Sequence, residues 1–428
     1  MELKKYKIGD LVQVTRGASL GGEFYATQGN YVRLTCGNFD YRNNCFKENQ
    51  SKDNIYYTGG FKEEFLLEKG DIITPLTEQA IGLLGSTARI PESGKYIQSQ
   101  DIAKIDCNES LLDKDFAFYL ISSACVKQQL SAAAQQTKIR HTSPDKIKEC
   151  TVWIPSLDIQ KRIGRILTDI DNKIAINRQI NDNLEAMAKQ LYDYWFVQFD
   201  FPNEDGKPYK SSGGAMVWNE KLKREIPTSF DVKSLSEIIE VKDGTHDSPK
   251  PQDNGYFLLT SKHLTERGLD YASAYKISKE DYESINKRSK VDTNDILFSM
   301  IGTIGNSYFV EETNINFAIK NMALFKTSAK RWFSEYLYLY LSSCDYKHYE
   351  GNSLSGSIQK FVSLRTLRDM PILYHEDIIK VFAKEVRNII TMMVNLRKEN
   401  IELTKQRDEL LPLLMNGQAT VNYHLSDD

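Results

Sequence analysis

The most constraining feature of this chain is a long run of apolar residues with heptad spacing. Between residues 158 and 196 the core positions are separated alternately by four and three residues, the a/d spacing of a coiled-coil seam. They are Ile163, Leu167, Ile170, Ile174, Asn177, Asn181, Leu184, Ala188 and Leu191. Neither Gly nor Pro interrupts the run after Gly164. The spacing predicts a helix of roughly 40 residues, near 60 Å long at about 1.5 Å per residue.

A second run near the C-terminus has the same spacing. Its positions are Phe382, Val386, Ile389, Met393, Leu396, Asn400, Leu403, Arg407, Leu410 and Leu414. A shift of 219 residues places the first register on the second, and Asn181 then falls on Asn400. One such helix alone is as consistent with an amphipathic helix lying on its own domain. Two helices in one register favour mutual packing. We assign all of these positions to the helix-pair interface except Asn177, Ala188, Phe382, Arg407 and Leu414.

Other motifs repeat in the same order. The segment YKIGDLVQVTRG alternates like a strand and ends at Gly17, and VKSLSEIIEVKDG ends likewise at Gly244. A Gly-x-x-Gly turn follows in each half, within IGLLGS from Ile81 and within IGTIGNS from Ile301. Each match alone is weak, but their shared order indicates an internal repeat.

These patterns predict an α+β fold with a pseudo-two-fold internal repeat. Two similar globular mixed α/β domains are separated by two long antiparallel coiled-coil helices. The predicted parts are residues 1–156 (first globular domain), 157–197 (first long helix), 198–227 (connector), 228–374 (second globular domain), 375–417 (second long helix) and 418–428 (tail). The Pro and Gly content of the connector predicts an irregular linker rather than a core segment.

Composition narrows the class of protein. The 428 residues carry a net charge of −3, which argues against a histone-like, purely electrostatic nucleic-acid binder but allows a local basic face. The six cysteines form no CxxC pair, and the N-terminus has no apolar signal core. No run of 18 apolar residues is present. We therefore expect a cytoplasmic protein with no membrane partner.

Catalytic and metal-binding motifs are missing. The sequence contains no GxxxxGK[ST] loop, no HExxH and no GxSxG, and its six histidines are scattered. We therefore predict no catalytic residues and no metal site. The Gly-x-x-Gly turns could approach a nucleic-acid backbone as a GXXG loop does, although a tight strand turn is the commoner role of so short a motif.

Basic and polar residues cluster near the same turns in both halves. Lys and Arg suit phosphates and guanine edges, and Gln suits adenine. Each residue singly is more often a solvated surface side chain, but the recurrence favours nucleic-acid binding. The candidate DNA-binding residues are Arg16, Arg33, Arg89, Lys138, Arg140, His141, Lys242, His246, Lys262, His263, Gln359 and Lys360.

This organisation resembles the specificity subunit of type I DNA restriction-modification systems. The resemblance covers nearly the whole chain, from the openings at Gly17 and Gly244 to the two long helices. The stretch LEAMAKQLYDYWFVQFDF, followed by a polar connector and REIPTSFDVKSL, is especially similar to the family's junction into its second recognition domain. No residue-level DNA-contact motif of the family transfers to this chain.

The resemblance implies a non-catalytic DNA reader with a coiled-coil spacer. Each recognition domain would read one half of a bipartite target in double-stranded DNA, and the helix pair would set the spacing of the half-sites. Two methyltransferase subunits and the restriction subunits would join it. S-adenosylmethionine, ATP and Mg would be bound by those partners, and this chain would hold no cofactor.

Two other classes compete with this interpretation. A coiled-coil scaffold that binds proteins would lack the steep salt dependence of specific DNA binding. An enzyme with unrecognised motifs would methylate or cut DNA without partner subunits.

Overall fold

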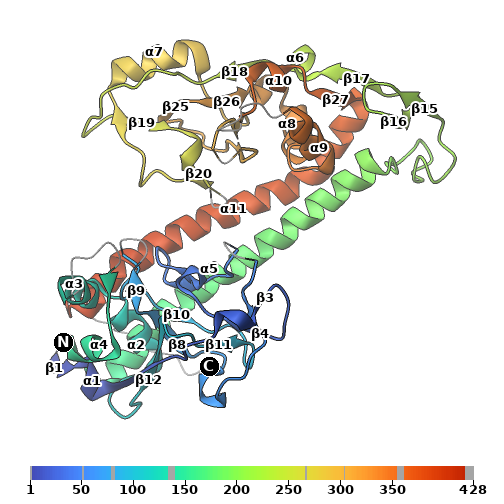
Figure 1. Ribbon diagram of the computed structural model, residues 1–428. Helices are drawn as coiled ribbons and strands as arrows, with labels where there is room; N and C mark the ends of the chain where they lie inside the picture. The colour runs from blue at the N-terminus through green and yellow to red at the C-terminus, as the bar shows by residue number, and fades with distance from the viewer. Residues whose placement is uncertain are drawn as a thin grey trace, which may run out of the picture. The chain divides into compact units, whose positions relative to one another are not determined.

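A computed structural model divides the chain into two compact units (Figure 1). Unit 1 contains Met1–Ala175 and Ile401–Asp428, and unit 2 contains Ile176–Asn400. The structure describes residues 2–50, 53–78, 82–133, 140–265, 268–302, 304–353 and 361–419. Each unit includes part of two long helices, α5 (Leu157–Tyr192) and α11 (Glu376–Met415).

Unit 1 is built from small sheets with short helices beside them. One four-stranded sheet has the order β10-β8-β12-β2, and another has the order β11-β4-β7-β3. The strands of these sheets are β2 (Val12–Arg16), β3 (Tyr25–Ala26), β4 (Tyr31–Arg33), β7 (Tyr56–Tyr57), β8 (Ile72–Pro75), β10 (Ala88–Arg89), β11 (Tyr96–Ile97) and β12 (Ile102–Cys107). Two-stranded pairs join β1 (Lys4–Lys7) to β14 (Thr151–Ile154), β9 (Thr77–Glu78) to β13 (Arg140–His141), and β5 (Phe39–Asp40) to β6 (Cys45–Phe46). The helices are α1 (Ile8–Leu11), α2 (Lys114–Ile121), α3 (Ala124–Ala133) and α4 (Pro144–Glu149).

The core of unit 1 includes parts of both long helices. Ile163 and Leu167 of α5 and Leu414 of α11 are buried in one cluster with Phe116 of α2. Gly164 allows this close packing, because a Cβ at that position would lie 2.8 Å from the backbone nitrogen of Phe116. The glycine therefore lets α5 approach the start of α2.

Unit 2 repeats this plan. Its larger sheet has the order β18-β26-β23-β24, and a three-stranded sheet has the order β22-β19-β25. The strands are β18 (Val241–Asp243), β19 (Tyr256–Leu259), β22 (Lys276–Ile277), β23 (Ile296–Ser299), β24 (Ser307–Phe309), β25 (Phe317–Ile319) and β26 (Met322–Phe325). Two-stranded pairs join β17 (Asp231–Ser234) to β27 (Pro371–Tyr374), β20 (Leu264–Thr265) to β21 (Gly268–Leu269), and β15 (Met216–Asn219) to β16 (Arg224–Pro227). The helices are α6 (Leu235–Ile238), α7 (Lys279–Ser289), α8 (Arg331–Tyr340), α9 (Cys344–Ser353) and α10 (Leu364–Arg368).

The register of one strand pair shows the repeat in detail. Lys5 of β1 pairs with Trp153 of β14, and Val232 of β17 pairs with Leu373 of β27. The Gly-x-x-Gly turns also agree: Gly82, Gly85, Gly302 and Gly305 all have positive φ, between 77° and 96°. A side chain would be strained there, which explains the glycines at equivalent positions in both halves. The two units are copies of one fold.

The connector between the halves is more ordered than its composition predicts. Its residues Phe199, Phe201 and Ile226 are buried in the main core of unit 2, next to Tyr192 at the end of α5. A π-helical turn, Asp193–Val197, follows α5 directly and buries two aromatic side chains. The prediction of a linker without core residues is therefore wrong. The aromatic residues of the connector pack into the core of unit 2 despite the Pro and Gly residues between them.

The two long helices pack antiparallel within each unit. In unit 1, Asp171 of α5 faces Arg407 of α11, and in unit 2 Tyr192 packs on Phe382. All nineteen predicted seam positions are buried or half-buried, whereas residues one step away such as Ile176 and Met392 are exposed. In the part of the chain that the structure describes, no helix is long and apolar enough to cross a membrane.

Candidate nucleic-acid interface

Loops gather polar side chains at the end of β18 in unit 2. Gly244 begins the loop, where a Cβ would lie 2.8 Å from the carbonyl oxygen of Ile319. The next residues are held against the β25–β26 turn, since Thr245 forms a β-bridge with Lys320. The His246 ring lies between Asn321 Oδ1, 2.8 Å from Nδ1, and Asp243 Oδ2, 3.0 Å from Nε2. Its side chain stays 63% exposed.

A second loop joins this cluster through a 3-10 turn, Ser261–His263. The hydroxyl of Ser261 donates a hydrogen bond to the carbonyl oxygen of Asn321 at 3.2 Å. Lys262 at the centre of the turn is exposed. His263 is buried instead, and its Nδ1 accepts a hydrogen bond from the Thr260 backbone at 2.8 Å. Burial lowers the pKa of His263, so this residue acts as a neutral cap of the turn.

Unit 1 has the same frame with different side chains. The turn Cys36–Asn38 is capped by Asn38, whose Oδ1 accepts from the Thr35 backbone at 2.9 Å, as His263 does in unit 2. At Gly17 a Cβ would lie 2.3 Å from the carbonyl oxygen of Gln98. Arg16 is exposed beside this loop, and its Nε donates to the Gln100 carbonyl oxygen at 2.7 Å. The backbone of these two loops therefore recurs in both units, whereas their charged side chains differ.

A second recurring contact joins the Gly-x-x-Gly turn to a later basic segment. In unit 1, β9 pairs with β13, which carries Arg140 and exposed His141. Glu78 of β9 accepts a hydrogen bond from the Gly82 backbone at 2.8 Å and lies 3.5 Å from Arg140 Nη1. In unit 2 the corresponding contact is a bridge between Ile301 and Phe361. The structure thus joins the region of the Gly-x-x-Gly turn to a strand or bridge about 60 residues further along the chain in each half.

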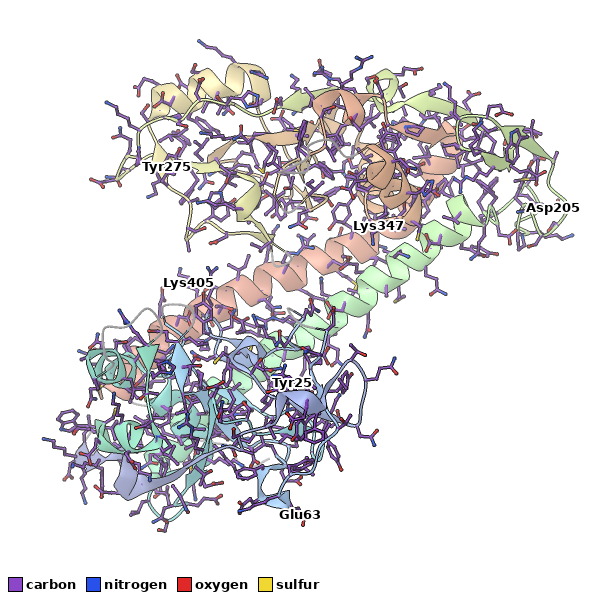
Figure 2. All side chains as sticks on the ribbon, viewed as in Figure 1. Tyr25, Glu63, Asp205, Tyr275, Lys347 and Lys405 are labelled. Atoms are coloured by element: carbon purple, nitrogen blue, oxygen red, sulfur yellow. The ribbon has the colours of Figure 1, made fainter. Side chains whose placement is uncertain are left out.

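Three further candidate residues also have structural partners. Arg33 is 6% exposed, its guanidinium carbon lies 3.7 Å from the ring centroid of Tyr25, and Nη2 donates to the Asn54 carbonyl oxygen (Figure 2). Arg89 bonds Asp115 at 2.7 Å. Lys242 lies 3.1 Å from Glu240 Oε2. Lys138, Gln359 and Lys360 lie outside the described residues.

Sequence reasoning missed three residues of the unit 2 cluster. Asn321 contacts His246, Lys320 Nζ donates a hydrogen bond to Ser248 Oγ, and Arg288 Nη2 lies 3.8 Å from Asp243 Oδ2. They lie between 45 and 75 residues from their partners in sequence, so no local pattern could group them. The left-handed backbone of Asn321, with φ of 53°, marks the sharp turn that presents it.

Duplicated α+β units, each presenting polar loops at one sheet end and sharing two antiparallel helices, define the architecture of a two-headed recognition protein. A sequence model of the type I restriction modification DNA specificity domain matches residues 1–186 and again residues 227–374. These matches cover more than half of the chain, which therefore belongs to this family. Its function is DNA target recognition in a restriction-modification complex, and this role is non-catalytic.

Known relatives agree along most of their length. The specificity subunit of the type I restriction enzyme MjaIX of Methanocaldococcus jannaschii is 23% identical over 360 residues, covering 79% of this chain and 78% of the relative. That of the Haemophilus influenzae enzyme HindI is 22% identical over 483 aligned positions, covering 97% and 99%. A crystal structure of the type I restriction-modification S subunit from M. genitalium shares the fold, with a TM-score of 0.58 and 16% identity over 97% of this chain and 96% of that one.

Proposed function

We propose that each unit reads one half of a bipartite DNA target through the loops described above. One observation carries this proposal: the backbone of these loops is repeated in both units, whereas the side chains on the loops differ. In unit 2 the loops present His246, Lys262 and Asn321. The strand registers and the capped 3-10 turns place Gly37 and Asp101 of unit 1 at the positions of Lys262 and Asn321, and Arg16 at the position of Asp243. Equivalent frames with different donors and acceptors suit two different half-sites.

The chemistry of these loop residues assigns them roles; Lys262 is exposed, and Lys320 and Asn321 are half-buried. Lys262 and Lys320 contact phosphates, because an ammonium group offers charge without the planar geometry that distinguishes bases. Asn321 presents an amide that can pair with adenine, and Arg16 suits guanine. The other candidate residues remain predictions. Among them, Arg33, Arg89 and His263 hold the fold of their unit through contacts within the protein.

We further propose that two methyltransferase subunits and the restriction subunits assemble on this chain. In unit 2, α5 exposes Ile176, Ile180 and Met187, with exposed fractions of 53%, 39% and 55%. Their spacing of four and seven residues puts them on one helical face beside the seam. Such a face suits a helix of a methyltransferase subunit. S-adenosylmethionine, ATP and Mg are bound by the partners, and none is bound by this chain.

A domain exchange tests the proposal most sharply. Residues 28–148 are replaced by those of another specificity subunit, and the methylated motif is read from the genome of a host that supplies the partner subunits. We expect one half of the motif to change while the other half and the spacer stay the same. If both halves changed, the units would not be independent readers. Exchange of the corresponding part of unit 2 is the matched control and changes the opposite half.

Point variants distinguish DNA contact from a structural role. Lys262→Ala and Lys320→Ala weaken DNA binding for every sequence, and each lowers the slope of log K against log salt by about 1. Lys279→Ala, on exposed helix α7, is the control and leaves the slope unchanged. A protein scaffold without DNA specificity would show no steep slope at all.

A further inference from the structure

The face formed by the α2–α3 turn and β14 is covered in unit 2, whereas the described residues of unit 1 leave it uncovered. Equivalent residues follow from the repeat: the Ser122-Ser123 pair corresponds to Ser342-Ser343, and Trp153 corresponds to Leu373. Trp153 is 46% exposed, whereas Leu373 is 4% exposed. The equivalent surface is therefore more exposed in unit 1 than in unit 2.

In unit 2 the connector covers this face. Arg224 at the start of β16 donates to both carboxylate oxygens of Asp345, at 2.9 and 3.3 Å, and packs its guanidinium over Phe199. Leu222 and Tyr209 pack against the same core. The remaining cavity has a volume of about 300 Å³. The connector thus covers this face with an arginine, two aromatic side chains and a leucine.

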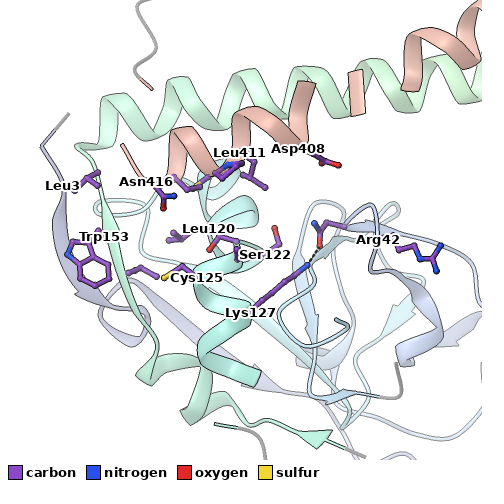
Figure 3. Close-up of a pocket in the computed structure, with 16 residues that line it drawn as sticks. Leu3, Arg42, Leu120, Ser122, Cys125, Lys127, Trp153, Asp408, Leu411 and Asn416 are labelled. Carbon is purple, nitrogen blue, oxygen red and sulfur yellow. Dashed lines mark hydrogen bonds between the residues drawn. The ribbon is translucent and has the colours of Figure 1, made fainter. Parts of the chain in front are cut away.

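In unit 1 the described residues leave a pocket of about 540 Å³ at the equivalent place, which we call the α3 pocket (Figure 3). Its apolar wall includes Leu120, Val152 and Leu411, with Trp153 at the rim. Cys125 stands where unit 2 has Asp345. A connector like that of unit 2 would bring an arginine to a position that has no carboxylate.

The α3 pocket has Cys125 in place of the Asp345 carboxylate of its counterpart, and cations line it. Lys127 is half-buried and points toward Asn44, whose Oδ1 lies 3.4 Å from Nζ (Figure 3). Among the described residues no carboxylate forms an ion pair with Lys127, and burial lowers its pKa. Exposed Arg42 adds a second cation. The negative charge of Asp408 offsets part of this effect of burial on Lys127, but the Asp408 carboxylate forms its ion pair with Arg407, at 2.7 Å. A half-buried ammonium without an ion-pair partner favours an anionic ligand.

We propose that the α3 pocket binds a segment of a partner protein that carries a carboxylate next to an aromatic or large aliphatic side chain. The apolar side chain packs on Leu120, Val152 and Trp153, and the carboxylate pairs with Lys127. The size of the pocket and the cover seen in unit 2 both indicate a peptide rather than a small ion. This docking site is additional to DNA recognition and does not depend on it.

Selection from a random peptide library tests the proposal without assuming a partner. The full-length chain is panned with displayed nine-residue peptides, and the Lys127→Glu variant is used for counter-selection. We expect the retained peptides to carry Asp or Glu close to Phe, Trp or Leu. A synthetic peptide of this kind should bind Lys127→Glu at least tenfold more weakly than the wild type.

Matched variants control for folding. Lys347 occupies the equivalent position in unit 2 and is exposed, so Lys347→Glu should change affinity less than twofold (Figure 2). Trp153→Ala should weaken binding several-fold, whereas Trp218→Ala, at an equally exposed Trp in unit 2, should not. Thermal unfolding of each variant verifies its fold, and Lys127→Met serves as a second variant without charge reversal.

Four outcomes would overturn the proposal. The first two are recovery of no peptide, and recovery of basic peptides that bind Lys127→Glu as tightly as the wild type. The third is dimerisation of the chain that Lys127→Glu abolishes, which would make a second copy the occupant. The fourth is a tenfold gain in peptide affinity for a chain ending at Ala419, which would make residues 420–428 the occupant.

Discussion

The side-chain amide of Asn177 donates a hydrogen bond to Asn400 Oδ1 at 3.0 Å and another to Glu399 Oε2 at 2.7 Å across the helix pair. The internal repeat makes Asn181 the counterpart of Asn400 and Leu396 the counterpart of Asn177. The symmetric contact would therefore pair Asn181 with Leu396, which has no donor. The Oδ1 atoms of both Asn177 and Asn181 are buried without a hydrogen-bond partner among the described residues, so the two bonds donated by the Asn177 amide are what distinguishes the positions.

This asymmetry predicts opposite effects of two similar substitutions. Asn181→Leu should raise the free energy of unfolding of unit 2 by about 1 kcal/mol, because it removes a buried unsatisfied oxygen and adds apolar contact. Asn177→Leu should lower it by about 1–2 kcal/mol, because two hydrogen bonds are lost. Urea unfolding of the full chain measures both. Equal shifts of the same sign would show that the two positions are equivalent.

The pair Arg407–Asp171 predicts strong coupling in unit 1. Arg407 is 8% exposed, its Nη1 lies 2.9 Å from Asp171 Oδ1, and Tyr119 donates to Oδ2 of the same carboxylate at 2.7 Å. Arg407→Ala should cost about 3 kcal/mol or more, since it leaves a part-buried carboxylate uncompensated.

The other repeat suggests how to restore this loss. Its equivalent residues, Ala188 and Ile390, form a buried apolar contact region. The double variant Arg407→Met, Asp171→Ile should therefore recover most of the stability, with a coupling energy above about 1.5 kcal/mol in a double-mutant cycle. Additive losses of stability would show that Arg407 and Asp171 contribute independently of each other.

Glu311 predicts a pH dependence of unit 2. Burial raises its pKa from 4.5 to about 7, and the Lys398 ammonium at 3.9 Å offsets only part of this effect. Because the folded pKa lies above the unfolded one, the folded state binds more protons between these values, and stability falls as the pH rises from about 4.5 to about 7.

Glu311→Gln should remove this dependence, worth up to roughly 3 kcal/mol for a shift of this size. Thermal unfolding at a series of pH values between 4.5 and 8 provides the measurement. Glu280→Gln, at an exposed glutamate of α7, is the control. A wild-type stability that is flat or rising over this window, after subtraction of the variant's profile, would contradict the assignment.

The continuous seam predicts that helix length sets the spacing of the half-sites. Seven residues are inserted after Ile174 in α5 and seven before Leu403 in α11, which preserves the Asp171–Arg407 and Asn177–Asn400 contacts. Each insertion adds about 10 Å of helix, so the spacer of the methylated motif should lengthen by about 3 base pairs with both half-sites unchanged. An unchanged spacer would rule out a measuring role. Insertion into α5 alone is the control, and it should abolish methylation by shifting the seam.

The seam could be read from sequence because its signal is local. Heptad spacing fixes which side of a helix is covered, and the antiparallel partner had only to supply the same pattern. The repeat was equally visible, since glycines such as Gly82 and Gly302 occur where the backbone has positive φ, a conformation that would strain other residues.

The candidate interface could be read only in part. Arg33 and His263 have the residue types of DNA contacts, yet Tyr25 covers one and the Thr260 turn encloses the other. Those partners follow from strand packing and capping, which basic composition does not reveal. Asn321 was missed for the converse reason, since its role depends on a turn that folding brings to His246.

We propose that this chain directs adenine methylation to one bipartite sequence. The most direct measurement is the genome-wide methylation pattern of a host with this chain intact and with it deleted, the genes for the partner subunits being untouched. We predict that deletion removes methylation at a single two-part motif, whose halves and spacer the pattern itself reports. An unchanged pattern in cells that express the chain and its partners would contradict the account.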